Sequence, residues 1–392
     1  MKTINNKKAI SLIVLVITII VMIVLAGAIV LTLNNSGIIN KAQNAVDKTN
    51  EAQVKQIAQL GWAEAYAAGA RTEVELQAGV DAILEKNNID TSMYGIKVTT
   101  SGVKVVKGWL QDGLTVIRGE EVLTIGDDFE YDETAEGTTD VAWKVLGASE
   151  EGELLIMSSS DIVSSHILGD KNYEELEECQ NDWLNGAAEL DGLCEPYGKG
   201  ESATGARSIR VEDVNKITGY DPETAKDGEG KLWEYGNEVT YSYNGTTKPA
   251  YTATNGLSGT LTETHDDGFH YYNGTDFVVA DLSTATGIII TLKSKYYYYS
   301  ARSLETIDNE SKAYKMIFGE DGTYYWLASP VVGTNTDYAV FGIRYVDYGS
   351  VNIYPLWASI GACDFSGSGV RAVVSLATDI QVTGDSTNGW SY

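Results

Sequence analysis

The sequence has few cationic residues relative to its acidic ones. Its 392 residues include 28 Lys and Arg against 55 Asp and Glu, which gives a formal net charge of −27. Phosphate recognition depends on Lys and Arg, so a surface this acidic repels polyanions and anionic lipid. The composition therefore excludes nucleic acid as a partner.

Histidine is also scarce, with three residues in the whole chain. His265 and His270 flank Asp266 and Asp267, and these four residues are the one group that resembles a set of metal ligands. The segment is turn-like, and no further Cys or His lies near it in the sequence. We therefore expect no metal site, and no motif in the chain predicts a cofactor.

Three cysteines leave one thiol over in any pairing. Cys179 and Cys194 either pair across a short loop, which stabilises a fold by about 2–4 kcal/mol, or remain reduced. The chain has neither a Gly-x-Ser-x-Gly turn nor a paired Cys-His signature. We therefore expect no catalytic residues and no enzyme.

What the chain does have is 40 Gly and 24 Tyr beside only 5 Pro, a balance typical of a body rich in strands and turns.

Residues Ile10 to Leu33 form an uncharged, largely apolar run. A helix of that length spans about 36 Å and crosses a bilayer core of about 30 Å. A cleaved secretory signal is the alternative, but its apolar region is usually about 7–15 residues long. Lys2, Lys7 and Lys8 precede the run, which predicts that the chain starts in the cytoplasm and that the body lies outside the cell. Without these three cations, the formal charge of the remaining chain is −27 − 3 = −30. We predict a basic leader over 1–9, a transmembrane helix over 10–33, and localisation at the cell membrane or surface.

The next segments carry local signals for two helices and a hairpin. Apolar residues recur at near-helical spacing from Ile39 to Leu60 and predict an amphipathic helix. Thr72 and Glu75 match a capping box, which predicts a second helix ending near Asn87. The apolar pattern then alternates about a Ser101-Gly102 turn, as in a β-hairpin.

An acidic stretch, GDDFEYDETAEGTTD, runs from Gly126 to Asp140. It lacks the ordered ligand spacing and central Gly of a calcium-binding loop, so we interpret it as a solvated linker. We place a domain boundary there, which divides the remaining chain into 34–125 and 126–392.

The segments after the linker alternate between short β-type runs and turns. VAWKVLG and ELLIMSS, beginning at Val141 and Glu153, predict two strands. Asn244-Gly245 and Asn273-Gly274 each lie between β-rich flanks and predict hairpins. We attribute the Asn-x-Thr matches at these two sites to turn chemistry.

The most informative stretch runs from residue 324 to residue 376. Apolar and small residues form a frame, which includes Trp326, Leu327, Phe341, Gly342, Arg344, Gly349, Val370, Arg371, Val373 and Val374. Between them lie polar and aromatic residues that suit an adaptable binding surface, because Tyr offers contact area at low entropy cost and short polar side chains offer hydrogen bonds. The alternative is an ordinary β-rich surface on which Tyr covers the edges of the core. We predict the ligand-binding residues to be Asn335, Asp337, Tyr338, Tyr345, Asp347, Tyr348, Ser350, Asn352, Tyr354, Trp357, Ser359, Ile360, Asp364, Ser366 and Ser368.

The leader NNKKA, the apolar run and the SGIINKAQNAVDKTNEAQ continuation resemble type IV pilins and pilin-like proteins of Gram-positive, Clostridia-like bacteria. In that family a prepilin peptidase cuts before the apolar run, which implies processing after Ala9 and a methylated mature N-terminus at Ile10. The residue before the cut is usually Gly in that family, but here it is Ala9, and Val14 occupies the fifth mature position, where a glutamate is expected. That glutamate normally contacts the N-terminal amine of a neighbouring subunit. Two alternatives therefore remain: a protein that assembles with other pilin subunits, and a single-pass surface protein that does not assemble.

The strings YWLASP, FGIRYV and GVRAVVSL, with NDWLNG and ARSIRVEDVNKITGYDP upstream, resemble C-type-lectin-like surface proteins of gut bacteria. Retroelements diversify many of those proteins by randomising template adenines, chiefly in Asn codons near the 3′ end of the gene. The resemblance implies an invariable frame and varied positions between Val331 and Ser368. Trp357 is not reachable from an Asn codon. The formylglycine-generating oxidases share this fold class but need two active-site cysteines close together, a motif that this chain lacks.

Together these observations predict an α+β protein. It has a long N-terminal pilin-like helix, a small helix and strand headgroup over 34–125, and an irregular C-type-lectin-like, formylglycine-generating-enzyme-like domain over 126–392. The expected function is that of a surface-displayed adhesin whose diversified face binds an unknown surface protein or glycan. A structural minor pilin or pseudopilin without a dedicated ligand is the alternative, and a formylglycine-generating-like enzyme is a more remote one.

Overall fold

The computed structural model describes the backbone of thirteen segments of the chain. These are 38–168, 186–220, 238–243, 250–253, 258–260, 270–272, 277–279, 288–293, 308–319, 323–334, 339–347, 349–358 and 367–392. Side chains are described within these ranges except at 38–48, 238–293, 330–341, 353 and 355–358. The predicted leader, the transmembrane run and the processing positions Ala9 and Ile10 lie outside the described residues. In the part of the chain that is described, no helix has both the length and the apolar character needed to cross a bilayer.

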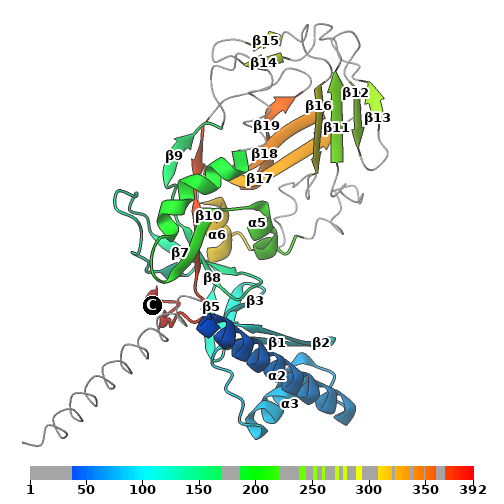
Figure 1. Cartoon of the computed structure of the whole chain (residues 1–392), viewed down its shortest axis with the longest axis vertical. Coiled ribbons are helices and arrows are strands. Elements are labelled where there is room, and N and C mark those ends of the chain that lie inside the picture. The colour runs from blue at the N-terminus through cyan, green and yellow to red at the C-terminus, as the bar shows by residue number, and fades with distance from the viewer. Residues whose placement is uncertain are drawn as a thin grey trace, which may run out of the picture. The chain divides into compact units, whose positions relative to one another are not determined.

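The described chain is a mixed α+β protein, which confirms the predicted class. Two N-terminal helices are followed by several sheets (Figure 1). The chain divides into two compact units, the first over Met1–Asp90 with Val98–Val105 and the second over Thr91–Lys97 with Val106–Tyr392. The predicted boundary at residue 126 therefore falls inside the second unit.

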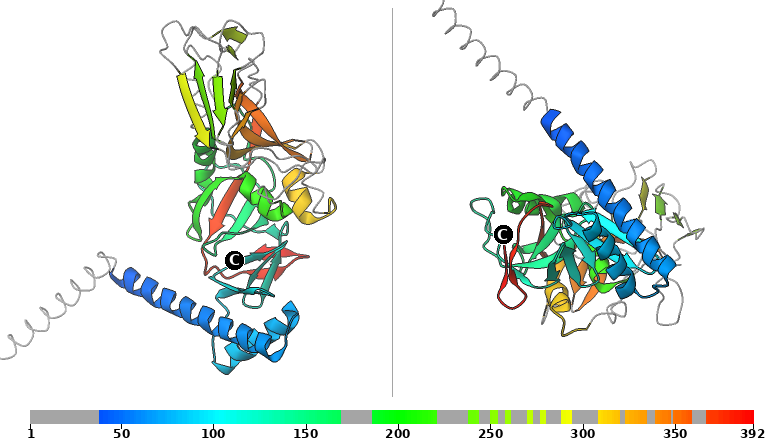
Figure 2. Two further views of the ribbon diagram at one scale, coloured as in Figure 1. Left: turned by 90° about the vertical axis from the view of Figure 1, so that its right-hand side faces the viewer. Right: turned by 90° about the horizontal axis from the view of Figure 1, so that it is seen from below.

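The first unit contains two helices that pack side by side (Figure 2). They are α2 (Ile38–Ala68) and α3 (Glu73–Lys86). The approach is close, because a Cβ added at Gly79 lies 2.3 Å from the Cβ of Ala65. Val54 and Ala58 of α2 are buried, but Leu60 is 50% exposed, so the sequence placed Leu60 on the apolar face wrongly. Each residue turns a helix by about 100°, so Leu60, two residues after Ala58, lies about 200° around the helix and on its opposite side.

The local signals for the second helix and the first hairpin are confirmed. The Thr72 side chain accepts a hydrogen bond from the Glu75 backbone N–H, and the Glu75 side chain accepts from the Thr72 backbone N–H, so the capping box is complete. These bonds lower the pKa of Glu75, chiefly through the backbone N–H groups of Arg71 and Thr72. The hairpin consists of β1 (Tyr94–Thr99) and β2 (Gly102–Lys107).

The second unit contains five further sheets among the described residues. The three-stranded sheet has β3 (Leu110–Asp112), β4 (Thr115–Arg118) and β5 (Glu121–Thr124) in sequence order. The largest sheet contains β6 (Asp128–Phe129), β7 (Trp143–Ala148), β8 (Leu154–Ser158), β10 (Ala203–Ser208), β21 (Ala372–Leu376), β22 (Thr383–Asp385) and β23 (Gly389–Ser391). Its order is β10-β21-β8-β7-β6-β23-β22, and the two strands predicted from VAWKVLG and ELLIMSS are confirmed as the neighbours β7 and β8.

A five-stranded sheet positions the predicted ligand-binding residues. It contains β9 (Val163–His166), β17 (Tyr324–Thr334), β18 (Ala339–Asp347), β19 (Ser350–Ala358) and β20 (Ser368–Val370), in the order β19-β18-β17-β20-β9. Strands β17, β18 and β19 are antiparallel neighbours, drawn in orange in Figure 1. Three helical segments accompany the sheets: η1 (Glu195–Gly198), α5 (Val211–Thr218) and α6 (Lys312–Phe318). A further helical segment spans 186–194.

The predicted strands that flank both Asn-Gly pairs do form antiparallel partners. A four-stranded sheet, β13-β12-β11-β16, consists of β11 (Glu238–Tyr243), β12 (Ala250–Ala253), β13 (Ser258–Thr260) and β16 (Ile288–Lys293). A separate pair consists of β14 (His270–Tyr272) and β15 (Phe277–Val279). The Asn-Gly pairs themselves lie outside the described residues.

The acidic stretch is not a solvated linker at its start, where Gly126, Asp127, Phe129 and Tyr131 are buried. Asp127 is fully buried, and its carboxylate accepts hydrogen bonds from Lys312 Nζ at 2.7 Å, Ser386 Oγ at 2.6 Å and Trp390 Nε1 at 3.0 Å. Burial raises the pKa of Asp127, but these donors outweigh it and the pKa is lowered. The linker interpretation is wrong here because the partners of Asp127 are far away in the sequence.

Candidate functional site

The register of three strands brings several predicted ligand-binding residues onto one face of the five-stranded sheet. Tyr345 on β18 lies opposite Asn352 on β19, Asp347 lies opposite Ser350, and Ile343 lies opposite Tyr354. Opposed residues share a face, and alternate residues along a strand return to it. The five predicted residues between 345 and 354 whose side chains are described therefore all belong to the same side.

One further residue on this side was missed by sequence reasoning. Tyr324, the first residue of β17, pairs with Asp347, and its side chain is 39% exposed. The Tyr324-Tyr325 pair in the sequence does not show which ring faces outward, because that depends on the β17–β18 register. We call the side chains of Tyr324, Tyr345, Asp347, Ser350 and Asn352 the hairpin face.

Beneath Tyr345 lies an aromatic group. The ring centroids of Trp326 and Tyr354 are 4.9 Å apart with an interplanar angle of 86°, and those of Tyr345 and Tyr354 are 5.6 Å apart at 88°. Trp326 is fully buried and donates from Nε1 to the His166 carbonyl oxygen at 2.8 Å. Tyr354 is 8% exposed, so two of the three rings hold Tyr345 from below rather than facing solvent.

The polar groups of the hairpin face bond to one another. Tyr345 Oη donates to Asp347 Oδ2 at 3.3 Å, and Ser350 Oγ donates to the Asp347 carbonyl oxygen at 2.8 Å. Asn352 Nδ2 in turn donates to Ser350 Oγ at 3.3 Å. Asp347 Oδ1, in contrast, has no hydrogen-bond partner. The network orders the side chains of the hairpin face.

The opposite side of these strands belongs to the protein core. Arg344 is 1% exposed, and its cross-strand partner Leu327 is fully buried. Tyr325 is also buried and donates to the Ile317 carbonyl oxygen at 2.6 Å. Burial raises the pKa of the Tyr325 hydroxyl above its ordinary value, so it stays a neutral donor. The frame residues described with their side chains are therefore structural.

Arg371 ties three elements of this core together. Its Nε donates to Asp161 Oδ1 at 3.2 Å, one terminal nitrogen donates to the Met316 carbonyl oxygen at 2.9 Å, and its guanidinium lies 4.4 Å from the centre of the Tyr325 ring. Burial raises the pKa of Asp161, although Arg371 opposes that shift. Arg371 therefore stabilises the fold through these contacts.

The remaining predicted site residues have different outcomes. Ser368 is 5% exposed and opposes His166 in the β20–β9 pair, so its side chain is buried. The backbone of Trp357 pairs with Phe341 beside a register shift. The others lie outside the described residues: Asn335, Asp337, Tyr338, Tyr348, Ser359, Ile360, Asp364 and Ser366.

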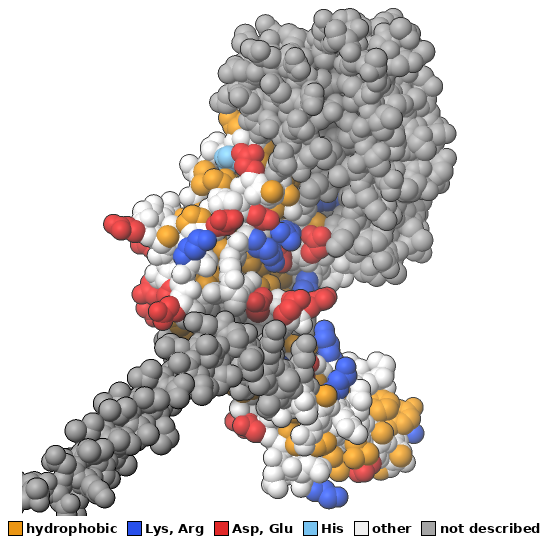
Figure 3. Space-filling model, in the orientation of Figure 1, with side chains coloured by type: hydrophobic (Ala, Val, Ile, Leu, Met, Phe, Trp, Pro, Cys, Tyr) orange, Lys and Arg blue, Asp and Glu red, His pale blue; other side chains and the backbone are white. Residues whose placement is uncertain are grey.

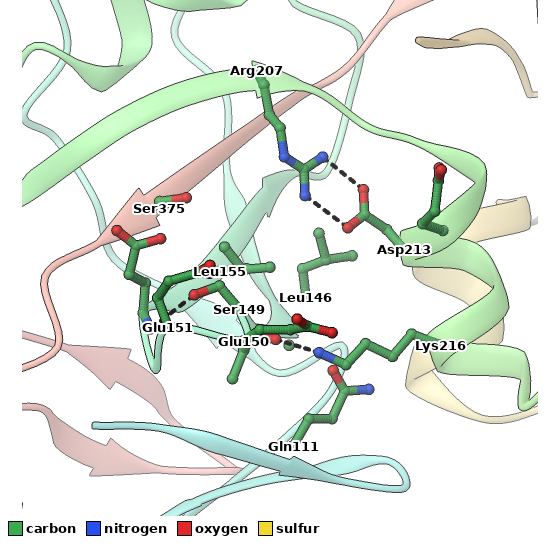
Figure 4. Close-up of a pocket in the computed structure, with 14 residues that line it drawn as sticks. Gln111, Leu146, Ser149, Glu150, Glu151, Leu155, Arg207, Asp213, Lys216 and Ser375 are labelled. Atoms are coloured by element: carbon green, nitrogen blue, oxygen red, sulfur yellow. Dashed lines mark hydrogen bonds and ion pairs between the residues drawn. The ribbon is translucent and has the colours of Figure 1, made fainter. Parts of the chain in front are cut away.

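A separate groove of about 570 Å³ lies at the β7–β8 turn beside α5 (Figure 4). Its two cations are engaged within the protein. Arg207 forms a two-pronged ion pair with Asp213, both N–O distances being 2.7 Å, and Lys216 Nζ donates to the Ala148 carbonyl oxygen at 2.5 Å. Burial lowers the pKa of Arg207, but Asp213 outweighs it and the pKa is raised. The groove draws on segments scattered over the chain, so no sequence motif indicates it.

Cysteine and histidine chemistry is limited in the described part of the chain. Cys194 is a free, fully buried thiol whose Sγ lies 3.8 Å from the Arg371 carbonyl oxygen, and burial raises its pKa. His166 Nε2 lies 2.8 Å from Glu189 Oε1. Within the described residues, no three His, Cys, Asp or Glu side chains are grouped to hold a metal ion.

Comparison with protein-family models, with curated proteins and with solved structures finds no match for the chain.

Proposed function

We propose that the chain is a surface-displayed, pilin-like adhesin whose C-terminal domain, of the C-type-lectin type, presents a diversified ligand-binding face. One observation carries the proposal. The predicted ligand residues Tyr345, Asp347, Ser350 and Asn352 share one half-buried face, while frame residues such as Leu327 and Arg344 fill the core behind it. A surface that varies needs this separation, because substitutions on it must leave the core intact.

The direct test of diversification does not require the ligand. The 3′ end of the gene is sequenced from many cells of one population, together with its flanks. We expect a neighbouring reverse transcriptase gene, a near-copy of the 3′ end, and substitutions confined to template adenines between Val331 and Ser368, outside the frame. A flank with neither the enzyme gene nor the copy, and a population without variation, contradicts diversification and leaves a fixed adhesin.

A second candidate, a structural minor pilin or pseudopilin, is favoured by the 31-residue helix α2 and its close packing on α3. A long helix leading into a small helix and strand headgroup suits a subunit that assembles through its N-terminal part. This candidate predicts that replacing Tyr345 and Tyr348 together, with the buried Tyr354 kept, changes no binding to cells or particles, while filament formation survives. Loss of binding with filaments intact favours the adhesin.

We do not include catalysis in the proposal. The remote formylglycine-generating alternative needs reactive cysteines, and burial raises the pKa of the Cys194 thiol, which disfavours the thiolate. If the protein turned over a substrate, and if substitution of a single residue abolished that turnover, the enzyme hypothesis would be supported.

A further inference from the structure

The hairpin face is rich in acceptors and poor in available donors. The hydroxyl protons of Tyr345 and Ser350 are already donated within the face, and so is one of the two amide protons of Asn352. What remains on Ser350, Asn352 and Asp347 is one amide proton and a larger set of oxygen lone pairs. A ligand that complements this face must therefore bring donors.

The charge at the face is negative, and the described strands β17, β18 and β19 carry no cationic side chain on the side of Asp347. Asp347 Oδ1 is shielded from water and has no hydrogen-bond partner. Arg344 is the only Lys or Arg in 323–334, 339–347 and 349–358, and it lies on the opposite side of β18, 1% exposed. An ionised carboxylate in that position favours a cation beside it.

Two tyrosines neighbour Asp347 on the hairpin face. Tyr324 is directly across the strand from Asp347, at the distance of a cross-strand pair, and Tyr345 donates its hydroxyl proton to it. Tyr324 is 39% exposed, so part of its ring is open to a ligand. Tyrosine rings attract cations through their faces and pack against aliphatic stems, so the pair suits a Lys or Arg side chain.

The net negative charge of the chain also favours a basic partner. The whole chain carries a formal charge of −27, and acidic side chains are scattered over the described surface of the second unit (Figure 3). Such a field raises the association rate of a basic partner and lowers that of an acidic one.

From these four observations we infer that the hairpin face binds a Lys- or Arg-bearing polypeptide segment. Asp347 pairs with the cationic group, and Tyr324 and Tyr345 contact its stem. The inference rests on the proposed function and narrows its ligand from an unspecified protein or glycan to a basic polypeptide. It also assigns Tyr324, outside the predicted varied positions, to the binding surface.

The test uses the full chain in detergent and a short peptide of alternating Lys and Ser as the probe. We expect binding that weakens as salt is raised, because the attraction is electrostatic. The same peptide with acetylated lysines, which lack the charge, should not bind. Asp347→Asn should weaken binding by about tenfold, the change expected for the loss of one charge-assisted hydrogen bond.

Matched controls separate the face from the general acidity of the chain. Asp379 is exposed in the same unit, and Asp379→Asn removes the same charge, so it should leave the affinity within about twofold. Tyr324→Ala should weaken binding severalfold, whereas Tyr66→Ala, which removes a tyrosine of similar exposure in the first unit, should not. Equal unfolding midpoints for the Asp347 and Asp379 variants ensure that both are folded.

Equal binding of the lysine and acetyl-lysine peptides overturns the inference. So does an Asp347→Asn variant that behaves like Asp379→Asn. Neither result touches the proposed function, which is tested by variation in the gene. Conversely, a gene without variation or a neighbouring reverse transcriptase leaves a fixed face that still selects the lysine peptide.

Discussion

Residues of the frame and of the hairpin face share strands β17 and β18, and the two groups differ in burial and in the range of their hydrogen bonds. Trp326 and Leu327 of the frame have no exposed surface, and Arg371 bonds to elements far away in the sequence. The side chains of Ser350 and Asn352 on the face are half-buried and bond to residues two or three positions away. Strand alternation places Leu327 and Arg344 on the side opposite the face, whereas Trp326 lies on the side of the face, buried against Tyr345 and Tyr354. The predictions that follow test how far stability and recognition are separated.

The largest effect is expected from the ring that connects the two regions. Trp326→Ala removes a fully buried indole that packs against Tyr345 and Tyr354, and it should lower the free energy of unfolding by about 3–5 kcal/mol. Urea denaturation measures the change. A loss below about 1 kcal/mol would mean that the indole is not part of the core.

The next largest effect concerns the guanidinium of the frame. Arg371→Met should cost about 3 kcal/mol, because it leaves Asp161 without its cation and the Met316 carbonyl without a donor. Arg210→Met is the control, since the ion pair of Arg210 with Asp191 is more exposed and should contribute at most about 1 kcal/mol. Denaturation of both variants under the same conditions gives their free energies of unfolding. Equal losses of this free energy would show that Arg371 stabilises the fold no more than Arg210 does.

A third prediction tests a buried charge elsewhere in the same unit. The lowered pKa of Asp127 means that its carboxylate contributes stability above its unfolded pKa of about 4 and loses that contribution as the pH falls through the folded value. Asp127→Asn should cost about 1–3 kcal/mol at pH 7. The difference from the parent should shrink on acidification below about pH 4, as followed by denaturation across pH. A constant difference would contradict the charge-based account.

Sequence reasoning succeeded where structure depends on neighbours in the chain. The Thr72 and Glu75 capping box and the turn at Ser101-Gly102 are local, so their residue types suffice to predict them. It failed at Asp127, where Ser386 and Trp390 are about 260 positions away and convert an apparent linker into part of the core.

The candidate site was predictable only in part for the same reason. The composition of residues 324–376 indicated an adaptable surface between frame residues. It did not indicate that Tyr354 and Ser368 are buried, or that Tyr324 joins the surface. The side on which Tyr324 lies depends on the register of β17 and β18, because a shift of one residue exchanges the two sides of a strand. The burial of Tyr354 depends on Trp326, which packs against it from β17.

The smallest effect on stability is expected on the face itself. Replacing Ser350 and Asn352 together by Ala should change the free energy of unfolding by less than about 0.5 kcal/mol for each position, because the hydrogen bonds of both side chains stay within the β18–β19 hairpin. Thermal unfolding of the double variant checks this expectation. A loss comparable with that of Arg371→Met would show that the face contributes to the fold as the frame does.

Saturation substitution of residues 324–376, read out by protease resistance and by capture of the lysine peptide in the same library, tests the separation most directly. Substitutions at Tyr324, Tyr345, Asp347, Ser350 and Asn352 should lower peptide capture while protease resistance is retained. Substitutions at Trp326, Arg344 and Arg371 should lower both. If substitutions on the hairpin face lower protease resistance as strongly as those in the frame, the separation of recognition from stability is contradicted.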